Sequence, residues 1–145
     1  MEQKRVMRQQ STILTTATPG PGLLEITDRI IDWVEDSGIQ HGLLTLFCQH
    51  TSASLLIQEN AVREVRDDLQ AWFERAAPED ASLYAHDDEG SDDMPAHIRS
   101  ALTSVQLTIP IINGRPALGT WQGIYVFEHR RRPHSRSIAL HVIGD

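Results

Sequence analysis

The chain has 145 residues, with very little cysteine, few aromatic residues and no long apolar segment. Its single cysteine, Cys48, excludes an intrachain disulfide and is compatible with a reducing compartment. No stretch approaches the roughly 20 apolar residues of a membrane helix. The basic start, MEQKRVMRQQ, is followed by polar residues where a signal peptide needs an apolar run. We therefore expect a cytoplasmic protein without a membrane partner.

Positive charge is also scarce, because 13 lysines and arginines stand against 20 acidic residues and the net charge is -7. Binding to the phosphate backbone of nucleic acids needs a basic surface, so a nucleic-acid partner is not expected. The length suits one domain with its own core. Since the sequence contains no internal repeat or long linker, residues 1–145 are expected to form a single domain.

The spacing of apolar residues predicts helices between strands. Helical periodicity covers 23–34, with Gly38 as a stop, then 60–76 and 93–102, where Pro95 suits a first turn. Asn113-Gly114 is typical of a tight hairpin turn. Short turns join the last strands, which favours an α+β domain with a mixed or antiparallel sheet packed against helices. Strands are expected within 10–20, 42–50, 51–59, 105–112, 119–129 and 136–144.

His50 ends an apolar strand and, in a regular strand, shares a face with Leu44, Leu46 and Cys48. This places an imidazole at the rim of a core. For one histidine taken alone, a partly buried ring bonded to a backbone carbonyl is the favoured interpretation. The hydroxyls of the following TSAS can serve an anion or simply form a turn.

Glu128 and Arg136 raise a similar question, because alternation puts each of them on the apolar face of its strand. They can form an ion pair, or they can line a polar pocket in which the guanidinium holds phosphate. The basic loop 129–136 either stays solvated or steers an anionic substrate. Gly119 and Gly123 within one strand indicate a bulge, or the close approach of a ligand or another backbone.

The stretch DDEGSDDMPAHIRSAL, residues 87–102, is acidic in its first half and helical in its second. Its acids do not match a calcium loop, which needs them at alternating positions with glycine at the sixth. His86 and His97 are not spaced as a helical chelate. From the residues alone, a solvated loop running into a capped helix is therefore favoured over a metal site.

Several longer segments resemble the YjbQ family (UPF0047 type), whose members are described as secondary thiamine-phosphate synthases. They are HTSASLLIQEN, YAHDDEGSDDMPAHIRSAL, IPIINGRPALGTWQGIYVFEHRRRP and RSIALHVIGD, and the match runs from about Thr12 to Asp145. The resemblance implies an α+β fold that assembles as a homotrimer. This sequence differs from the family pattern after the hydroxyl residues of TSAS. Relatives often carry an Asp-Pro-Asp segment there, and this chain has Val62, Arg63, Glu64 and Val65.

The resemblance also implies a polar pocket and a function. The function is a small enzyme that binds a phosphorylated small molecule and joins an aminopyrimidine-methyl diphosphate to a thiazole phosphate. The alternative is a non-catalytic trimer that binds a metal or a phosphorylated metabolite. The divalent metal would be Zn²⁺ or Mg²⁺, and imidazole ligands suit Zn²⁺ better. The implied metal ligands are His50, His86 and His97. The implied catalytic residues are Glu128 and His97. The implied substrate- or anion-binding residues are Thr51, Ser52, Ser54, Gly119, Thr120, Trp121, Gln122 and Arg136.

The acidic stretch yields one further prediction. His86 and His97 should point into the pocket, while the acids between them should mostly face water. Burying a carboxylate without a partner costs several kcal/mol of folding free energy, whereas a neutral imidazole is cheaper to bury.

Overall fold

The computed structural model describes residues 4–145. Within this range the chain forms eight strands, three α-helices and one short 3-10 helix, η1. In chain order they are β1 (Arg8–Thr18), β2 (Gly22–Glu25), α1 (Thr27–Ser37), β3 (His41–Cys48), β4 (Ala53–Glu59), α2 (Arg63–Ala76), η1 (Ala81–Leu83), α3 (Asp93–Leu102), β5 (Gln106–Ile112), β6 (Arg115–Pro116), β7 (Gln122–Glu128) and β8 (His134–Gly144).

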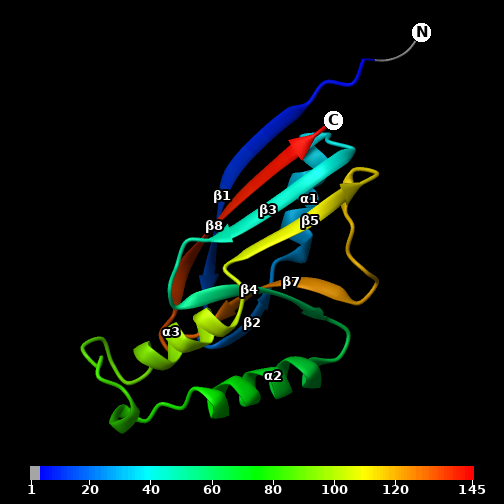
Figure 1. The fold of residues 1–145 in the computed structure, drawn as a ribbon. Helices are drawn as coiled ribbons and strands as arrows, with labels where there is room; N and C mark the ends of the chain where they lie inside the picture. The colour runs from blue at the N-terminus through cyan, green and yellow to red at the C-terminus, as the bar shows by residue number, and fades with distance from the viewer. Residues whose placement is uncertain (1–3) are drawn as a thin grey trace.

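The strands form two antiparallel sheets, one ordered β1-β8-β3-β5-β6 and the other β2-β7-β4 (Figure 1). The α+β prediction is confirmed. β1 and β8 come from opposite ends of the chain and pair along their whole length, with Arg8 opposite Gly144 and Thr18 opposite His134. In Figure 1, α1 lies behind the larger sheet, while α2 and α3 lie at the end where the smaller sheet is found.

The core lies between the inner face of the larger sheet, the smaller sheet and α1. Alternation along β3 buries Leu44, Leu46 and Cys48 and turns Leu43 and Phe47 outward. The core cluster as a whole contains Leu14, Ile26, Ile30, Val34, Ile39, Leu44, Leu46, Cys48, Ala53, Leu55, Ile109, Ile111, Ile124, Val126, Ile138, Leu140 and Val142. None of the helices in residues 4–145 is both long and apolar enough to cross a bilayer.

The outer face of the larger sheet has no helix over it (Figure 1). It carries large, partly exposed apolar side chains. Leu43 lies opposite Ile143, and Phe47 lies opposite Ala139, which in turn pairs with Ile13. Ile13, Leu43 and Phe47 are each about half exposed, at 53%, 48% and 47%. We call this surface, with Ile112 and Ile143, the open sheet face.

Local turn chemistry is predicted well. Asn113 and Gly114 have φ of 53° and 79°, as a type I′ hairpin turn requires. Gly38 ends α1 in the left-handed region, with φ of 72°. Helix α3 has the predicted bounds, Asp93–Leu102.

Several predicted element starts are wrong, and two strands, β1 and β8, begin two residues earlier than predicted. Leu23 belongs to β2 and pairs with Phe127, because the edge of β7 offers it backbone hydrogen bonds that outweigh its helical spacing. The helix therefore starts only at Thr27. Helix α2 starts at Arg63 rather than at residue 60. β7 starts at Gln122, so the residues at 119–121 precede the strand.

Candidate functional site

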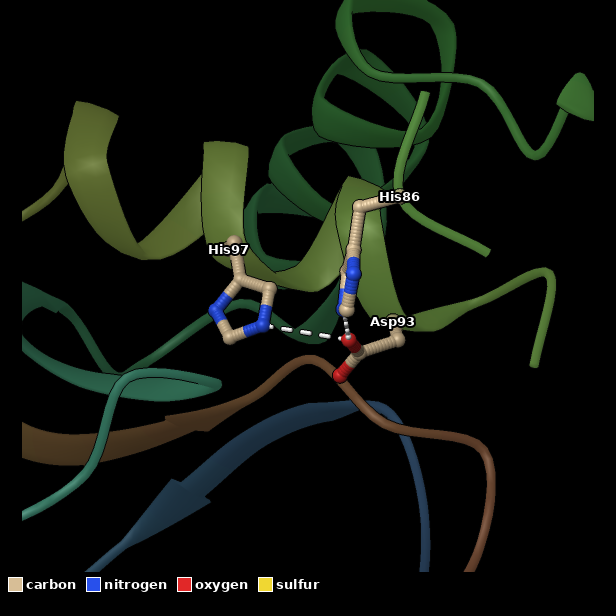
Figure 2. Close-up of side chains that lie close together, drawn as sticks. All are labelled: His86, Asp93 and His97. Atoms are coloured by element: carbon tan, nitrogen blue, oxygen red, sulfur yellow. Dashed lines mark hydrogen bonds and ion pairs between the residues drawn. The ribbon is translucent and has the colours of Figure 1, made fainter. Parts of the chain in front are cut away.

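The loop before α3 and the first turns of α3 bring together two histidines and an aspartate (Figure 2). His86 Nε2 lies 3.0 Å from Asp93 Oδ2, and His97 Nε2 lies 3.1 Å from the same oxygen. Asp93 and His97 are one helical turn apart, which puts them on one face of α3. The two histidines thus converge, and they do so around a carboxylate. We call these three residues the histidine–aspartate cluster.

Asp93 is buried, with 1% exposure, and arginine holds its carboxylate in place. Arg130 donates from Nη1 to Asp93 Oδ1 at 2.8 Å and from Nε to Asp92 Oδ2 at 3.1 Å. Burial opposes ionisation of Asp92, but hydrogen bonds from the Arg131 amide and from Arg130 outweigh it and lower the Asp92 pKa. Oδ2 of Asp93 is therefore left for the two imidazoles.

The acids of this stretch divide into two groups. Asp87, Asp88 and Glu89 are exposed, as predicted. Asp92 and Asp93 are buried, which corrects the prediction for these two residues. The loop after β7 supplies the Arg130 guanidinium to both carboxylates and the Arg131 amide to Asp92, a contact between segments far apart in the sequence.

A backbone carbonyl fixes the orientation of the His97 ring. His97 Nδ1 lies 3.0 Å from the Thr51 carbonyl oxygen, which can only accept a hydrogen bond. Nδ1 must therefore carry a hydrogen. In the neutral imidazole Nε2 then has none, so a lone pair on Nε2 faces a lone pair on Asp93 Oδ2 across 3.1 Å. Such a contact needs positive charge between the two atoms, either an additional proton or a metal ion.

The ligand chemistry of the cluster suits a metal ion. One nitrogen of each histidine and one Asp93 oxygen all lie within 4.8 Å of one another. Two ligands bound about 2.1 Å from a common ion are about 3.0–3.4 Å apart, close to the two separations between histidine and Asp93 found here. Metal-binding histidines commonly donate their other ring N–H to a carbonyl, which is the arrangement of His97 and Thr51.

The structure places His50 outside this cluster. Its Nε2 accepts a hydrogen bond from the Ser137 amide at 2.8 Å, which commits one of its two ring nitrogens. Burial, reinforced by the charge of Arg136, lowers the pKa of His50. Among residues 4–145, the carboxylate of Asp93 takes the third position that was expected for His50.

Glu128 and Arg136 form a buried ion pair, with 1% and 3% exposure. Glu128 also accepts from the Thr18 hydroxyl and from the amides of His129 and Arg130. Burial opposes its ionisation, but the bonds from Arg136 and Thr18 outweigh it and lower the Glu128 pKa. Of the two interpretations left open by the sequence, the ion pair is the one found. Both carboxylate oxygens are engaged, which leaves no free lone pair facing a substrate.

The hydroxyl residues of TSAS mainly make hydrogen bonds within the chain. The Ser52 hydroxyl and carbonyl both accept from Arg136 Nη2, at 3.1 and 3.2 Å. Ser54 is fully buried and lies 2.9 Å from His129 Nε2. Thr51 contributes its carbonyl to His97.

The GTWQG segment lies at the other end of β7 from Glu128. Gln122 pairs with Glu59, whereas Glu128 pairs with Ala53, so the strand separates the two ends by about 20 Å. Within one chain, Gly119, Thr120, Trp121 and Gln122 are therefore not brought to the histidine–aspartate cluster. A Cβ on Gly123 would lie 2.6 Å from Glu25 Oε2, so the close approach expected here is made by a side chain of this same chain.

A family model described as "UPF0047 protein YjbQ-like" matches residues 11–145. The chain belongs to this family. It is 52% identical to a UPF0047 protein of Synechocystis sp. over 95% of this chain and 94% of that one. It is 41% identical to the UPF0047 protein YjbQ of Escherichia coli O157:H7, over 91% of this chain and 96% of that one.

Solved structures of YjbQ-like proteins share the fold. A YbjQ-like protein of unknown function from Sulfolobus solfataricus superposes with a TM-score of 0.88 at 23% identity, covering 97% of this chain and all of that one. A YjbQ/UPF0047 protein from Clostridium acetobutylicum superposes with a TM-score of 0.80 at 32% identity, covering 92% and 98%.

In this YjbQ-like chain, sequence reasoning missed Asp93, Arg130 and the Thr51 carbonyl. A signal for Asp93 is present in the sequence, because Asp93 and His97 have the i, i+4 spacing of a helical chelate. Arg130 and Thr51 carry no comparable signal. Their contacts depend on how two distant loops meet α3.

Proposed function

We propose that this protein binds a divalent metal ion through His86, Asp93 and His97 and uses it to hold and act on a phosphorylated small molecule. The observation that carries the proposal is the His97 contact. Thr51 takes the ring hydrogen on Nδ1, so a proton or a metal ion must lie between the bare Nε2 and the Asp93 carboxylate, and we propose the metal ion. Three protein ligands are also the number typical of metal sites that leave a position for substrate.

The donor set favours Zn²⁺ over Mg²⁺. Two imidazoles and one carboxylate suit zinc and related transition metals, whereas Mg²⁺ prefers oxygen ligands and retains water. When bound, such an ion supplies a Lewis acid that can polarise a phosphoryl oxygen or activate a water molecule. Asp93 would be held for this role by Arg130, and His97 by Thr51.

Metal binding is tested on protein purified without an affinity tag, stripped with chelator and titrated calorimetrically with Zn²⁺ at pH 7.5. We expect one ion per chain, with affinity reduced at least about a hundredfold in His97→Ala and Asp93→Asn, since each loses a direct ligand. His41→Ala is the matched control, because His41 is an exposed histidine at the start of β3. Equal zinc affinity in wild type and His97→Ala would overturn the proposal.

The specific reaction that the family resemblance implies is thiamine-phosphate synthesis. Diphosphate leaves in that reaction, and its developing charge needs cationic groups such as a metal ion. We propose it as a weak activity of the histidine–aspartate cluster. The test is growth rescue of a thiamine-requiring strain that lacks its main synthase.

The expected result is rescue by the overexpressed wild type and by His41→Ala, and no rescue by His97→Ala at equal protein level. Rescue that persists in His97→Ala would place the activity elsewhere in the molecule. If the wild type binds zinc but never rescues, the non-catalytic alternative, a metal- or metabolite-binding trimer, replaces the enzyme.

We propose that the partner on the open sheet face is a further copy of this chain, in a homotrimer. Monomeric proteins seldom leave a large contiguous apolar surface in water, and Leu43 and Phe47 lie on this face about half exposed. The trimer is also what the family resemblance implies. Light scattering at micromolar concentration should give three times the chain mass, and Phe47→Asp should shift it towards one. A monomeric wild type would contradict the trimer.

A further inference from the structure

Two exposed parts of this chain are built from segments that lack Asp, Glu, Lys and Arg, although these residues make up 23% of the sequence. One is the open sheet face, whose side chains come from residues 9–15, 41–49, 106–112 and 137–143. The other is the loop at 117–121, which joins β6 to β7. Charged residues are depleted at the centres of protein interfaces, so both parts have the composition of surfaces that are buried between chains.

The loop at 117–121 presents Trp121 to water on an ordered backbone. Trp121 is 62% exposed, and its carbonyl accepts from the Asn60 amide at 3.0 Å. The Gly119 amide donates to Gln122 Oε1 at 2.8 Å, and the Gln122 amide donates to the Gly119 carbonyl at 3.1 Å. An ordered loop loses less conformational entropy on binding than a mobile one, and tryptophan is enriched among the residues that dominate binding energy. Trp121 is therefore suited to anchor a partner.

The open sheet face contains a groove of about 390 Å³ with a mostly apolar lining. Six of its lining residues form two rows across the strands, an apolar row of Ile13, Ala139 and Phe47 and a polar row of Ser11, His141 and Thr45. Ser11 Oγ lies 2.7 Å from His141 Nδ1. Whichever of the two atoms supplies the hydrogen, the hydroxyl oxygen keeps a lone pair that can accept a further bond. An apolar surface beside one acceptor is what a buried indole ring needs, because its N–H usually finds a partner.

Trp121 suits this groove better than the other strongly exposed tryptophan, Trp72. Trp72 is 51% exposed and lies on α2, where the exposed side chains of Asp68 and Arg75 are one turn away. Docking Trp72 against an uncharged face would take these charges out of water, which is costly. The loop at 117–121 has no such residue, and Arg115 before it is already paired with Glu35 at 3.1 Å.

We propose that Trp121 of one copy inserts into this groove on the next copy, and that this contact is the repeated interface of the ring. The inference rests on the homotrimer proposed for the open sheet face. In a closed ring of three chains each interface joins two different surfaces, so every chain must carry both. In Figure 1 the open sheet face is turned towards the viewer, and the loop between β5 and β7 lies at the edge of the molecule beyond β5.

The first test compares Trp121→Ala with the matched control Trp72→Ala by sedimentation velocity over a range of protein concentrations. Both side chains are more than half exposed, so both variants should fold. Trp121→Ala should raise the concentration at half assembly at least about tenfold, because truncating a central aromatic anchor typically weakens binding by that factor or more. Trp72→Ala should change it by less than about twofold, as for a surface residue outside the interface. An unchanged trimer in Trp121→Ala would overturn the insertion alone, whereas a monomeric wild type would overturn both the trimer and the insertion.

The second test locates the contact by cross-linking. Thr45 lines the groove and Thr120 precedes Trp121, while the native Cys48 is buried. The double variant Thr45→Cys, Thr120→Cys, treated with a short bismaleimide, should give covalent trimers under denaturing conditions, because each chain is then linked to both neighbours. Neither single variant should do so. Covalent dimers of the single variant Thr120→Cys, or a trimeric double variant that gives no covalent trimers, would contradict the insertion.

Discussion

Two polar clusters lie near the loop after β7, and they differ in how their hydrogen atoms are shared. In the buried pair of Glu128 and Arg136, the carboxylate accepts from a guanidinium, a hydroxyl and two amides. In the histidine–aspartate cluster, one Asp93 oxygen faces two ring nitrogens, and the nitrogen of His97 has no hydrogen in the neutral ring. The first cluster is complete within the chain, whereas the second needs a further proton or a metal ion between His97 and Asp93. Charged residues of the first kind hold the fold, and those of the second kind are available for function.

The largest effect on stability is expected from Glu128→Gln. The substitution leaves Arg136 buried without a charged partner, and removing one member of a buried pair costs about 3–5 kcal/mol. Urea denaturation in the presence of chelator should show this loss of unfolding free energy. The double variant Glu128→Gln, Arg136→Met should recover part of it, and a loss below about 1 kcal/mol in the single variant would contradict the structural role.

Zinc should stabilise the protein through the second cluster only. A ligand that binds the folded state alone adds about 2.7 kcal/mol at a free concentration one hundred times its Kd. Thermal unfolding of metal-free protein with and without Zn²⁺ measures the gain. Wild type and His41→Ala should gain equally and His97→Ala should gain nothing, whereas an equal gain in all three would show binding at other sites.

His129 should make the fold sensitive to mild acid. Burial, with the charge of Arg99, holds its pKa at about 3, below the ordinary value of 6.5. The unfolded chain therefore binds more protons below pH 6.5, so this contribution to stability is complete above that pH and decreases as the pH falls towards 3. Between pH 7.5 and 5.0 the decrease is about 2 kcal/mol. Denaturation at both values should show a decrease smaller by this amount in His129→Gln, and an equal decrease would contradict a buried neutral ring.

The smallest effect is expected for the exposed acids of the loop before α3. Asp87→Asn, Asp88→Asn and Glu89→Gln together should change the unfolding free energy by less than about 0.5 kcal/mol, because these side chains face water. Zinc affinity should change by only a few-fold, as screened charges allow. Loss of zinc binding in this triple variant would mean that the metal is held by the first half of the loop instead of by α3.

The parts of the fold that short segments determine are predictable from the sequence. Asn113-Gly114, Gly38 and helix 93–102 have the structures expected from turn, cap and periodicity chemistry. Leu23 has helical spacing to Ile26 and Ile30, yet pairing with β7 decides its conformation. Local spacing cannot report a partner strand that lies about a hundred residues away.

The site is predictable only in part, for the same reason. His86 and His97 do converge, but around Asp93. Whether an acid in this loop is buried depends on Arg130, more than thirty residues later, and nothing near Asp93 in the sequence identifies that partner. Arg99 Nε and His129 Nδ1, which are buried without a hydrogen-bond partner among residues 4–145, are equally invisible in the sequence, because an unmade hydrogen bond exists only once the packing is known.

All three members of the histidine–aspartate cluster lie between residues 86 and 97, while every residue of the core cluster lies outside this stretch. The cluster meets the strand framework through few contacts, among them the Thr51 carbonyl and Arg130. Such a division lets evolution exchange the chemistry of one short segment without rebuilding the sheets that support it. Related proteins of this architecture can therefore diverge in reaction while retaining the same scaffold.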